Sequence, residues 1–365
     1  MTPLIAIALS GGVDSMMAAA FLQEQNHRVV GIHFLTGYES GSAARDARPA
    51  IGLPGGSDSP GIRQIAAQLD IPLEIFDCSG PFQAGVVDYF MRTYQAGRTP
   101  NPCLVCNPTI KFGAVLAHAR HLGATRLATG HYARRIPDTA GRFHLHRGID
   151  PLKDQSYFLA RMTQKQLSQA CFPLERTTKA NVKKLAETEG LTAAVQAESQ
   201  DICFIKGRHY GEFLAQQPKF EARPGRIEDI NGNVLGEHKG LHLFTIGQRR
   251  GINCPASEPY YVVALDHNKN RLVVGLKKDL LCSECNIVDI NWIRGKPDKP
   301  LKVKTRVRYR HTAADSTLFP FEDRTAMIRF EAPQQALTPG QCAVFYRKDE
   351  VLGGGWIDRL VPCET

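Results

Sequence analysis

The apolar positions in about the first 200 residues form short runs rich in β-branched side chains, separated by stretches with helical periodicity. The runs have the length of buried strands and lie at residues 4–9, 28–34, 73–76 and 125–129. The helical stretches lie at residues 15–25, 62–69, 82–94 and 110–122. Such alternation predicts an α/β domain with a doubly wound parallel sheet.

The pattern changes after about residue 205, where short strands separated by turns replace the alternation. Asn231 and Gly232, between two β-rich segments, are a hairpin signal. Further strands are expected at residues 260–265, 271–275, 303–309, 326–330 and 342–346. We expect an α/β domain at 1–205, a small central module at 206–278 and a C-terminal β-barrel at 279–365.

Composition narrows the class of protein. Hydrophobic residues at 43% and charged residues at 22% exclude a disordered chain. The 45 Lys and Arg residues exceed the 36 Asp and Glu residues, and the net charge of +9 favours an anionic partner, with nucleic acid first.

The Gly-, Ser- and Pro-rich residues 36–60 predict a disordered connection or a lid. The apolar run at 4–9 is too short for a signal peptide or a membrane helix, and the ten cysteines suit a reducing compartment, so we expect a cytoplasmic protein.

A candidate phosphate site follows the first predicted strand directly. The sequence there is Ser10-Gly11-Gly12-Val13-Asp14-Ser15, and a predicted helix comes next. The glycines allow a tight turn, the serines offer hydroxyl donors, and the helix N-terminus adds positive potential, which together form an anion cradle. The order strand, loop, helix disfavours the alternative of a turn without a ligand. The segment lacks the Gly-Lys-Ser/Thr of a Walker loop.

Three cysteines form a candidate sulfur site. Cys103 and Cys106 make a Cys-x-x-Cys pair at the start of a predicted helix, whose dipole stabilises thiolates. Alone, such a pair is a redox pair or half of a zinc site. The third cysteine, Cys203, lies much further along the chain in a polar segment. Cys282 and Cys285 are interpreted as structural, with zinc as the alternative. The others are expected to be buried apolar side chains: Cys78, Cys171, Cys254, Cys342 and Cys363.

Residues 10–15 resemble the PP-loop of ATP pyrophosphatases, enzymes that split ATP between its α and β phosphates. Further motifs, in order along nearly the whole chain, are similar to those of the tRNA-specific 2-thiouridylase family. They are NPCLVCN at 101–107, IKFG at 110–113, ATGHYA at 128–133, KDQSYFL at 153–159, SQDICF at 199–204, FTIGQRRG at 244–251 and GGGWI at 353–357.

This resemblance implies ATP-dependent 2-thiolation of the wobble uridine in tRNAs for Lys, Glu and Gln. ATP adenylates the C2 oxygen, sulfur then attacks C2, and AMP leaves. Asp14 would position ATP and Mg²⁺, and Cys203 would carry a persulfide that Cys106 releases, which ends in a Cys106–Cys203 disulfide. The sulfur would come from a cysteine desulfurase, a relay protein or free sulfide. The phosphates would contact Ser10, Gly11, Gly12 and Ser15.

One position departs from the commoner family pattern, which has Asp where this chain has Cys103. A carboxylate there is a plausible acid or base for the neighbouring thiol. Cys103, Cys106 and Cys203 could instead bind three irons of a 4Fe-4S cluster, whose fourth iron would hold an activated sulfide. Because a cysteine has no obvious advantage in the persulfide route, the sequence favours the cluster.

Two motifs add candidate ligand contacts. Gly130 and His131 follow a predicted strand, where α/β sheets place ligand-binding residues, although a hydrogen-bonded core histidine is the alternative. Lys153 and Gln155 precede a predicted apolar turn, and the resemblance implies contact with ATP or tRNA there. The structural alternative for this second motif is a helix cap.

A row of cations indicates a nucleic-acid surface. Alternation on a strand places the cations on one face, which suits phosphate contacts; they are Lys302, Lys304, Arg306, Arg308 and Arg310. Arg249 and Arg250 add a second basic segment. Because the uridine must reach the first domain, we expect it to be extruded from the single-stranded anticodon loop.

Two other functions compete with thiolation. A PP-loop ligase or amidotransferase would adenylate a carboxylate or an amide, but such an enzyme needs neither three thiols nor a basic barrel. A non-catalytic tRNA-binding protein would not need an intact loop at residues 10–15.

Overall fold

The computed structural model describes residues 2–39, 60–195, 202–205, 209–218, 220–255 and 257–362. The chain divides into two compact units. The first unit contains residues 1–86, 103–206 and 349–351, and the second contains residues 87–102, 207–348 and 352–365. No helix in the described ranges is long and apolar enough to cross a membrane.

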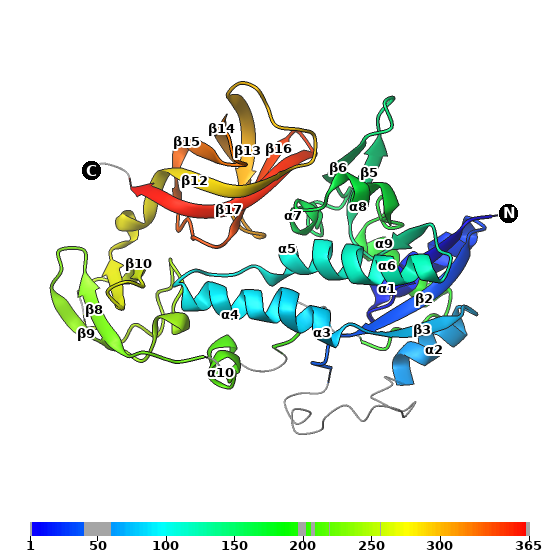
Figure 1. The fold of residues 1–365 in the computed structure, drawn as a ribbon, viewed down its shortest axis with the longest axis horizontal. Coiled ribbons are helices and arrows are strands. Elements are labelled where there is room, and N and C mark those ends of the chain that lie inside the picture. Colours follow the sequence, from blue (N-terminus) through cyan, green and yellow to red (C-terminus); the bar gives the residue numbers. More distant parts are fainter. Residues whose placement is uncertain are drawn as a thin grey trace. The chain divides into compact units, whose positions relative to one another are not determined.

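The first unit is built on a five-stranded parallel sheet in the order β3-β2-β1-β4-β7. Strands β2 and β3 of this sheet are labelled in Figure 1. Its strands are β1 (Leu4–Ala8), β2 (Arg28–Leu35), β3 (Leu73–Asp77), β4 (Arg126–Ala128) and β7 (Ala170–Cys171). The chain runs outward from β1 through β2 and β3 and then returns to the other side of β1 at β4. This arrangement confirms the predicted α/β sheet, and the order reverses between β1 and β4.

Apolar helices cover this sheet. Helix α1 (Val13–Glu24) is apolar on most of its faces, and its buried residues include Met16, Met17 and Leu22. These side chains share one core with Ile5, Ile7 and other sheet residues. Helix α9 (Lys179–Thr188) packs against α1, and helix α2 (Pro60–Gln68) adds Ile65 to the same core. Because the buried residues of α1 pack on the sheet, they hold the start of α1 close to the end of β1.

Two predicted helices are longer than expected, and each contains a wide π-helical segment. One run comprises α3 (Ser79–Phe82), the π-helix η2 (Gln83–Val87) and α4 (Asp88–Gln95). The other comprises α5 (Pro102–Cys106), the π-helix η3 (Asn107–Val115) and α6 (Leu116–His121). The Gln166 amide donates to the carbonyls of Pro108 and Phe112, at 2.6 and 3.2 Å, and so satisfies acceptors within η3. Wide helical turns occur frequently at functional sites.

The sequence did not predict a hairpin inserted after β4. It consists of β5 (Ala133–Pro137) and β6 (Phe143–Arg147), and within the first unit β6 pairs with Glu350 and Val351. Two short helices follow, α7 (Ser156–Leu159) and α8 (Gln164–Gln169). Thr163 and Gln166 form a capping box at the start of α8, which is a local signal for this helix.

The second unit contains a four-stranded sheet in the order β10-β11-β8-β9. Its strands are β8 (Gly225–Asp229), β9 (Val234–His238), β10 (Tyr261–Asp266) and β11 (Arg271–Gly275). The predicted hairpin at Asn231 and Gly232 is confirmed, and Gly232 has a φ of +87° that favours glycine. The expectation that the second half contains only strands is wrong at α10 (Tyr210–Ala215), where the His209 side chain caps the helix and Phe213 and Leu214 are buried.

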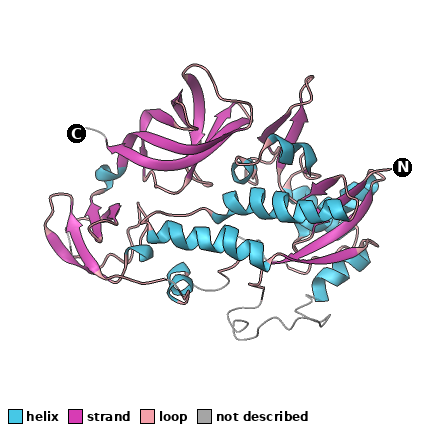
Figure 2. Cartoon of the chain, viewed as in Figure 1, coloured by secondary structure: helices cyan, strands magenta, loops and turns pink. Residues whose placement is uncertain are grey.

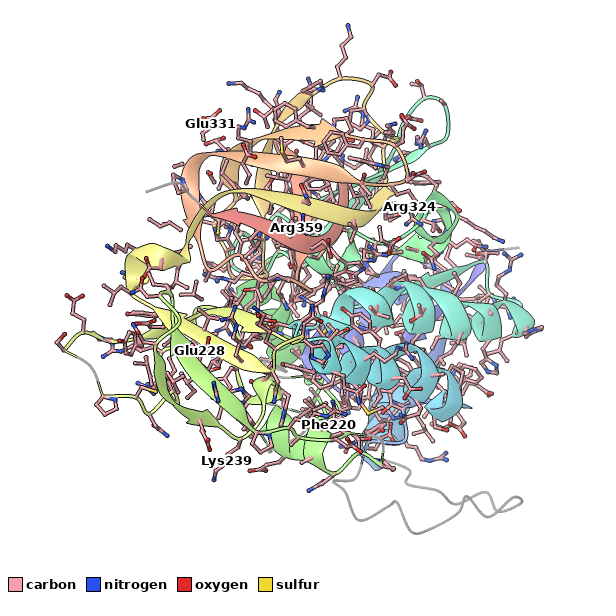
Figure 3. The ribbon with its side chains drawn as sticks, turned by 60° about the vertical axis from the view of Figure 1, so that its left-hand side comes forward. Phe220, Glu228, Lys239, Arg324, Glu331 and Arg359 are labelled. Carbon is pink, nitrogen blue, oxygen red and sulfur yellow. The ribbon has the colours of Figure 1, made fainter. Side chains whose placement is uncertain are left out.

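A closed six-stranded β-barrel completes the second unit (Figure 2). Its strands are β12 (Leu281–Trp292), β13 (Leu301–Arg306), β14 (Ala314–Pro320), β15 (Ala326–Gln335), β16 (Cys342–Arg347) and β17 (Glu350–Pro362). Strands β12 and β17 pair and close it. Gly353 permits this closure, because an added Cβ would lie 2.3 Å from the Asn291 carbonyl oxygen. In Figure 3, Glu331 and Arg359 lie on barrel strands, whereas Glu228 lies on the four-stranded sheet.

The strand predicted at 303–309 ends earlier, at Arg306. The Arg306 guanidinium donates to the backbone carbonyls of Tyr309 and His311 and so turns the chain back. The alternation of burial nevertheless continues, because Val303, Thr305 and Val307 are buried. Lys302, Lys304, Arg308 and Arg310 are exposed, whereas Arg306 is only partly exposed, and only the first three of these five cations belong to the strand.

Candidate active site

The candidate phosphate loop lies where the strand order of the parallel sheet reverses. Residues 10–15 follow β1, and residues 129–131 follow the neighbouring strand β4. A Cβ added to Gly130 would lie 2.7 Å from the Asp14 carbonyl carbon and 2.8 Å from the Ser15 nitrogen. Only glycine permits this approach. In open α/β sheets, the reversal point is the usual site of ligand binding.

Internal hydrogen bonds hold the loop in shape. Gly11 has a φ of +88°, which a residue with a side chain rarely adopts. The Ser15 hydroxyl donates to the Gly12 carbonyl at 3.0 Å and accepts from the Ser10 backbone N–H at 3.2 Å. Ser15 is buried and Ser10 is exposed. Ser15 therefore braces the loop, and its hydroxyl lies 3.2 Å from that of the exposed Ser10 near the N-terminus of α1, where positive potential favours an anion.

Asp14 has two strong partners that the sequence did not reveal. The Nζ atom of Lys179 lies 2.6 and 2.7 Å from the two Asp14 carboxylate oxygens, and the Tyr132 hydroxyl donates to Oδ1 at 2.7 Å. Lys179 is 7% exposed. A nearly buried ammonium therefore lies next to the candidate phosphate loop.

The backbone also fixes Lys179. It is the first residue of α9, and its N–H donates to the Asp150 carboxylate at 2.9 Å. The Thr178 hydroxyl accepts from the Asn181 N–H at 3.3 Å and caps the same helix. Because Lys179 lies 165 residues from Asp14 in the sequence, no local motif connects the two.

His131 is a buried side chain with a polar partner. Its Nδ1 atom lies 2.7 Å from the Thr129 hydroxyl oxygen, and the residue is 8% exposed. Burial, and then the charge of Lys111, hold the pKa of His131 well below its usual range. The imidazole is therefore neutral at pH 7. This matches the hydrogen-bonded core histidine that the sequence left as an alternative to a ligand contact.

The three candidate thiols all belong to the first unit. Cys103 and Cys106 lie on α5, and Cys203 lies in a turn and is exposed. Desolvation raises the pKa of Cys106 to about 12 and the pKa of Cys103 to about 11, although Cys103 reaches the surface. The charge of Lys111 opposes this rise for both thiols, whereas Cys203 adds to it. The three sulfur groups are thus close enough to affect one another's ionisation.

The described residues show no assembled ligand set for the 4Fe-4S cluster that the sequence favoured. Within the described part of the chain, no three His, Cys, Asp or Glu side chains are grouped so as to hold a metal ion. Cys103, Cys106 and Cys203 are therefore close but not gathered around one centre.

The remaining cysteines behave mostly as packing residues. Cys282 and Cys285 are buried in the barrel core, and desolvation raises the pKa of Cys285 to about 12. This burial agrees with their structural interpretation, and zinc stays the alternative. Cys78 and Cys342 are buried as expected, but Cys171 and Cys254 are only partly buried. Cys363 lies outside the described residues, as do residues 40–59 of the expected disordered connection.

Comparison with known proteins decides the family. Residues 4–207 match a model described as the tRNA methyl transferase HUP domain, residues 211–276 match its PRC-barrel domain, and residues 282–357 match an aminomethyltransferase β-barrel domain. A protein of Desulfosudis oleivorans named tRNA-specific 2-thiouridylase MnmA is 47% identical over 355 residues, which are 97% of this chain and 95% of the relative. A protein of the same name from Moorella thermoacetica is 42% identical over 97% of this chain and 99% of its own. The chain belongs to the tRNA-specific 2-thiouridylase family.

Membership of this family makes the chain an enzyme. Residues of two family motifs also make structural hydrogen bonds. In the KDQSYFL motif, the Gln155 side chain accepts the Tyr132 N–H at 3.1 Å, and Asp154 accepts the Ser156 N–H at 3.0 Å at the start of α7. The helix-capping alternative therefore accounts for Asp154. Lys153 is partly exposed.

The cations of this thiouridylase-family chain differ in their surroundings. Lys304 lies 2.8 Å from Asp315 on the adjacent strand β14, and Lys302 lies 3.4 Å from Glu331 on β15, so both have carboxylate neighbours. Arg308 is exposed.

In the FTIGQRRG motif, the Gln248 side chain accepts the Thr245 N–H at 3.0 Å and donates to the Arg250 carbonyl at 2.9 Å. This brace leaves Arg249 and Arg250 exposed.

Proposed function

We propose that this enzyme forms 2-thiouridine at the wobble position of tRNAs for Lys, Glu and Gln, through an adenylated intermediate. Its relatives, 40–47% identical over nearly the full chain, carry the name tRNA-specific 2-thiouridylase. One observation about this chain carries the proposal: a phosphate loop with a buried lysine and a set of three interacting thiols belong to the same compact unit. The substrate tRNA and the reduced thiols favour the cytoplasm.

The first half-reaction activates the uridine. Its C2 oxygen attacks the α-phosphorus of ATP, the bond to the β-phosphate breaks, and pyrophosphate leaves while the base loses a proton. Negative charge gathers on the phosphates. The N–H groups at the start of α1, the exposed Ser10 hydroxyl and the Lys179 ammonium are the groups that stabilise it. Gly130 lets residues 129–131 pack closely against this loop.

The chemistry of Asp14 fits a role with Mg²⁺. This ion usually binds to one or two carboxylates together with substrate phosphates, and the Asp14 side chain is 33% exposed. Asp14 would hold the ion, which would neutralise phosphate charge. In turn, Lys179 would be released from Asp14 and would bind a phosphate oxygen of the leaving pyrophosphate.

The second half-reaction uses thiols. A donor protein, a cysteine desulfurase or a relay, supplies Cys203 with a persulfide, since Cys203 is exposed. The terminal sulfur attacks C2 and AMP leaves, which gives a mixed disulfide between the uridine and Cys203. The Cys106 thiol loses its proton and attacks the Cys203 sulfur, the thiouridine is released, and a Cys106–Cys203 disulfide forms. A thiol reductant restores the enzyme. Lys111 favours the thiolate that this attack needs.

The basic segments of the second unit would bind the tRNA backbone. Arg249, Arg250 and Arg308 are exposed cations, and such residues supply most of the affinity for nucleic acid. Lys302 and Lys304 contribute less, because each has a carboxylate within 3.4 Å.

The experiment incubates the enzyme with ATP, Mg²⁺, a persulfide donor and a tRNA transcript for Glu, and analyses the nucleosides by mass spectrometry. The expected result is 2-thiouridine at the wobble position and none in a transcript with cytidine there. If the wild-type enzyme releases pyrophosphate with a free carboxylate or amide substrate and leaves the tRNA unmodified, the ligase alternative replaces this proposal.

A further inference from the structure

The residue that follows Cys203 is the centre of a three-ring cluster. Phe204 is 5% exposed. Its ring centroid lies 5.6 Å from that of Phe82, in an edge-on arrangement, and 5.9 Å from that of Tyr38. The rings of Tyr38 and Phe82 are themselves 6.2 Å apart. These separations are those of favourable aromatic pairs, worth roughly 0.5–1.5 kcal/mol each beyond burial.

Hydrogen bonds hold the two partner rings independently of Phe204. The Tyr38 hydroxyl donates to the Gln83 side chain at 2.5 Å. The turn before Tyr38 is closed by Glu39, whose carboxylate accepts from the Thr36 hydroxyl at 2.8 Å. The Phe82 N–H donates to the Cys78 carbonyl at 2.8 Å within α3. Phe204 thus packs into a seat formed by Tyr38 and Phe82, which hydrogen bonds hold independently of Phe204.

The seat also connects the Cys203 turn to the helix that carries the other thiols. Helix α3, which supplies Phe82, packs against η3, and η3 continues α5 with Cys103 and Cys106. Cys203 itself is exposed and lies in a turn rather than in a helix or strand. The packing of Phe204 is therefore a contact that can set where the Cys203 turn lies relative to α5.

We propose that Phe204 is a positioning residue for sulfur transfer, which seats the Cys203 turn between Tyr38 and Phe82 so that its sulfur faces the thiols of α5. The proposal rests on the proposed function of Cys203. It requires no contact between Phe204 and the tRNA or ATP. Because a misplacement of about 1 Å can slow a reaction about 100-fold, loss of the ring is expected to slow the transfer step specifically.

The test measures how fast the Cys106–Cys203 disulfide forms in the full-length enzyme exposed to glutathione disulfide, by peptide mapping. Phe204→Ala is expected to slow disulfide formation and thiouridine turnover about 10- to 100-fold. The KM for tRNA and the pyrophosphate release in the first turnover stay at wild-type values. Phe76→Ala is the matched control, because Phe76 stacks on His118 at 4.1 Å in the same unit and has no role in the seat.

Two further variants decide the remaining outcomes. Tyr38→Ala removes one wall, retains Phe204 and is expected to give an intermediate slowing, whereas Tyr38→Phe is expected to behave as wild type. If Phe204→Ala does not fold, an unslowed, folded Tyr38→Ala variant overturns the proposal; so does a folded Phe204→Ala variant with the wild-type disulfide rate. Thiouridine formation by Cys203→Ser would instead refute the proposed function, whatever Phe204 does.

Discussion

The ammonium of Lys179 forms a two-pronged ion pair with Asp14, with its Nζ atom 2.6 and 2.7 Å from the two carboxylate oxygens. The lysine is nearly buried, whereas the carboxylate is one-third exposed. Removal of one partner leaves the other without its counter-charge at the phosphate loop. This pair therefore links the stability of the loop to its chemistry.

In a double-mutant cycle, we expect substitutions of Asp14 and Lys179 to affect the rate of pyrophosphate release and the stability of the fold differently. Asp14→Asn and Lys179→Met should each reduce pyrophosphate release about 10²- to 10³-fold, as loss of one stabilising charge does at other active sites. Asp14→Asn should also destabilise the fold by about 1–3 kcal/mol, below the range for a fully buried pair because Asp14 is partly exposed.

The double variant Asp14→Asn with Lys179→Met should regain stability in urea and remain inactive, because no uncompensated charge is left. Arg176→Met is the control, since this side chain is 86% exposed. Additive losses of stability in the double variant would show that the ion pair does not couple the two residues.

The thiols on α5 should respond to pH as weakly acidic groups. With the pKa of Cys106 near 12 and that of Cys103 near 11, both are protonated at neutral pH. Their thiolate fraction, and hence their alkylation rate by iodoacetamide, should rise about tenfold per pH unit between pH 7 and 9. A plateau below pH 9 would contradict these pKa values.

Lys111→Met should slow the alkylation of Cys103 and Cys106 further at every pH. The lysine charge lowers the pKa of both thiols, and its removal lets each pKa rise. Lys111→Arg retains the charge and serves as the control. Mass spectrometry of alkylated peptides measures each thiol separately, and equal rates in the Met and Arg variants would exclude the electrostatic role.

The exposed arginines should carry the salt dependence of tRNA binding. Arg308→Ala should reduce the slope of log affinity against log salt by up to about one unit for one lost phosphate contact. Lys304→Ala is the matched control on the preceding strand, because its ammonium already lies 2.8 Å from Asp315. Filter binding over a range of salt concentrations measures both slopes. An unchanged slope for Arg308→Ala would locate the RNA surface elsewhere.

The barrel cysteines should be structural. Cys285→Ala should lower the stability of the barrel by about 1 kcal/mol, because it removes one buried sulfur from the core, and should leave thiouridine formation unchanged. Treatment of the wild-type enzyme with a zinc chelator should not alter its melting temperature. A chelator effect that disappears in Cys285→Ala would support the zinc alternative.

Local sequence order predicted the parts of the site that are local in the chain. Strand, loop and helix follow one another around Ser10–Ser15, so this local arrangement could be predicted without a structure. The Asp14–Lys179 pair could not, because its members are 165 residues apart and a lysine after a helix-capping threonine is a common surface pattern. The packing of Phe204 could not be predicted from its motif either, since its partner Phe82 comes from a distant helix.

Elements set by tertiary contacts were the least predictable. The β5–β6 hairpin pairs with Glu350 and Val351 near the far end of the chain, so its partner was invisible to a local pattern. The strand through Val303 ended early because Arg306 bonds to carbonyls beyond it. The division into domains at 1–205, 206–278 and 279–365 stays a prediction, as do the roles of the named ATP, tRNA and sulfur-transfer residues.

Cys103 separates the two sulfur routes. Cys103→Asp restores the commoner family residue and should give an active, colourless enzyme. Cys106→Ser and Cys203→Ser should each abolish turnover. Anaerobic purification followed by iron and sulfide analysis provides the readout. Brown protein with near-equal iron and sulfide, lost together with activity in Cys103→Asp, would instead support the cluster and overturn the thiol route.

The most direct test of the two-step account is a single-turnover measurement of pyrophosphate and 2-thiouridine on the same tRNA sample. The wild-type enzyme should release one pyrophosphate for each thiouridine formed. Cys203→Ser should release pyrophosphate and AMP-modified tRNA without thiouridine, and Asp14→Asn should produce neither. Thiouridine formed by Cys203→Ser, or formed by Asp14→Asn without pyrophosphate release, would contradict the account.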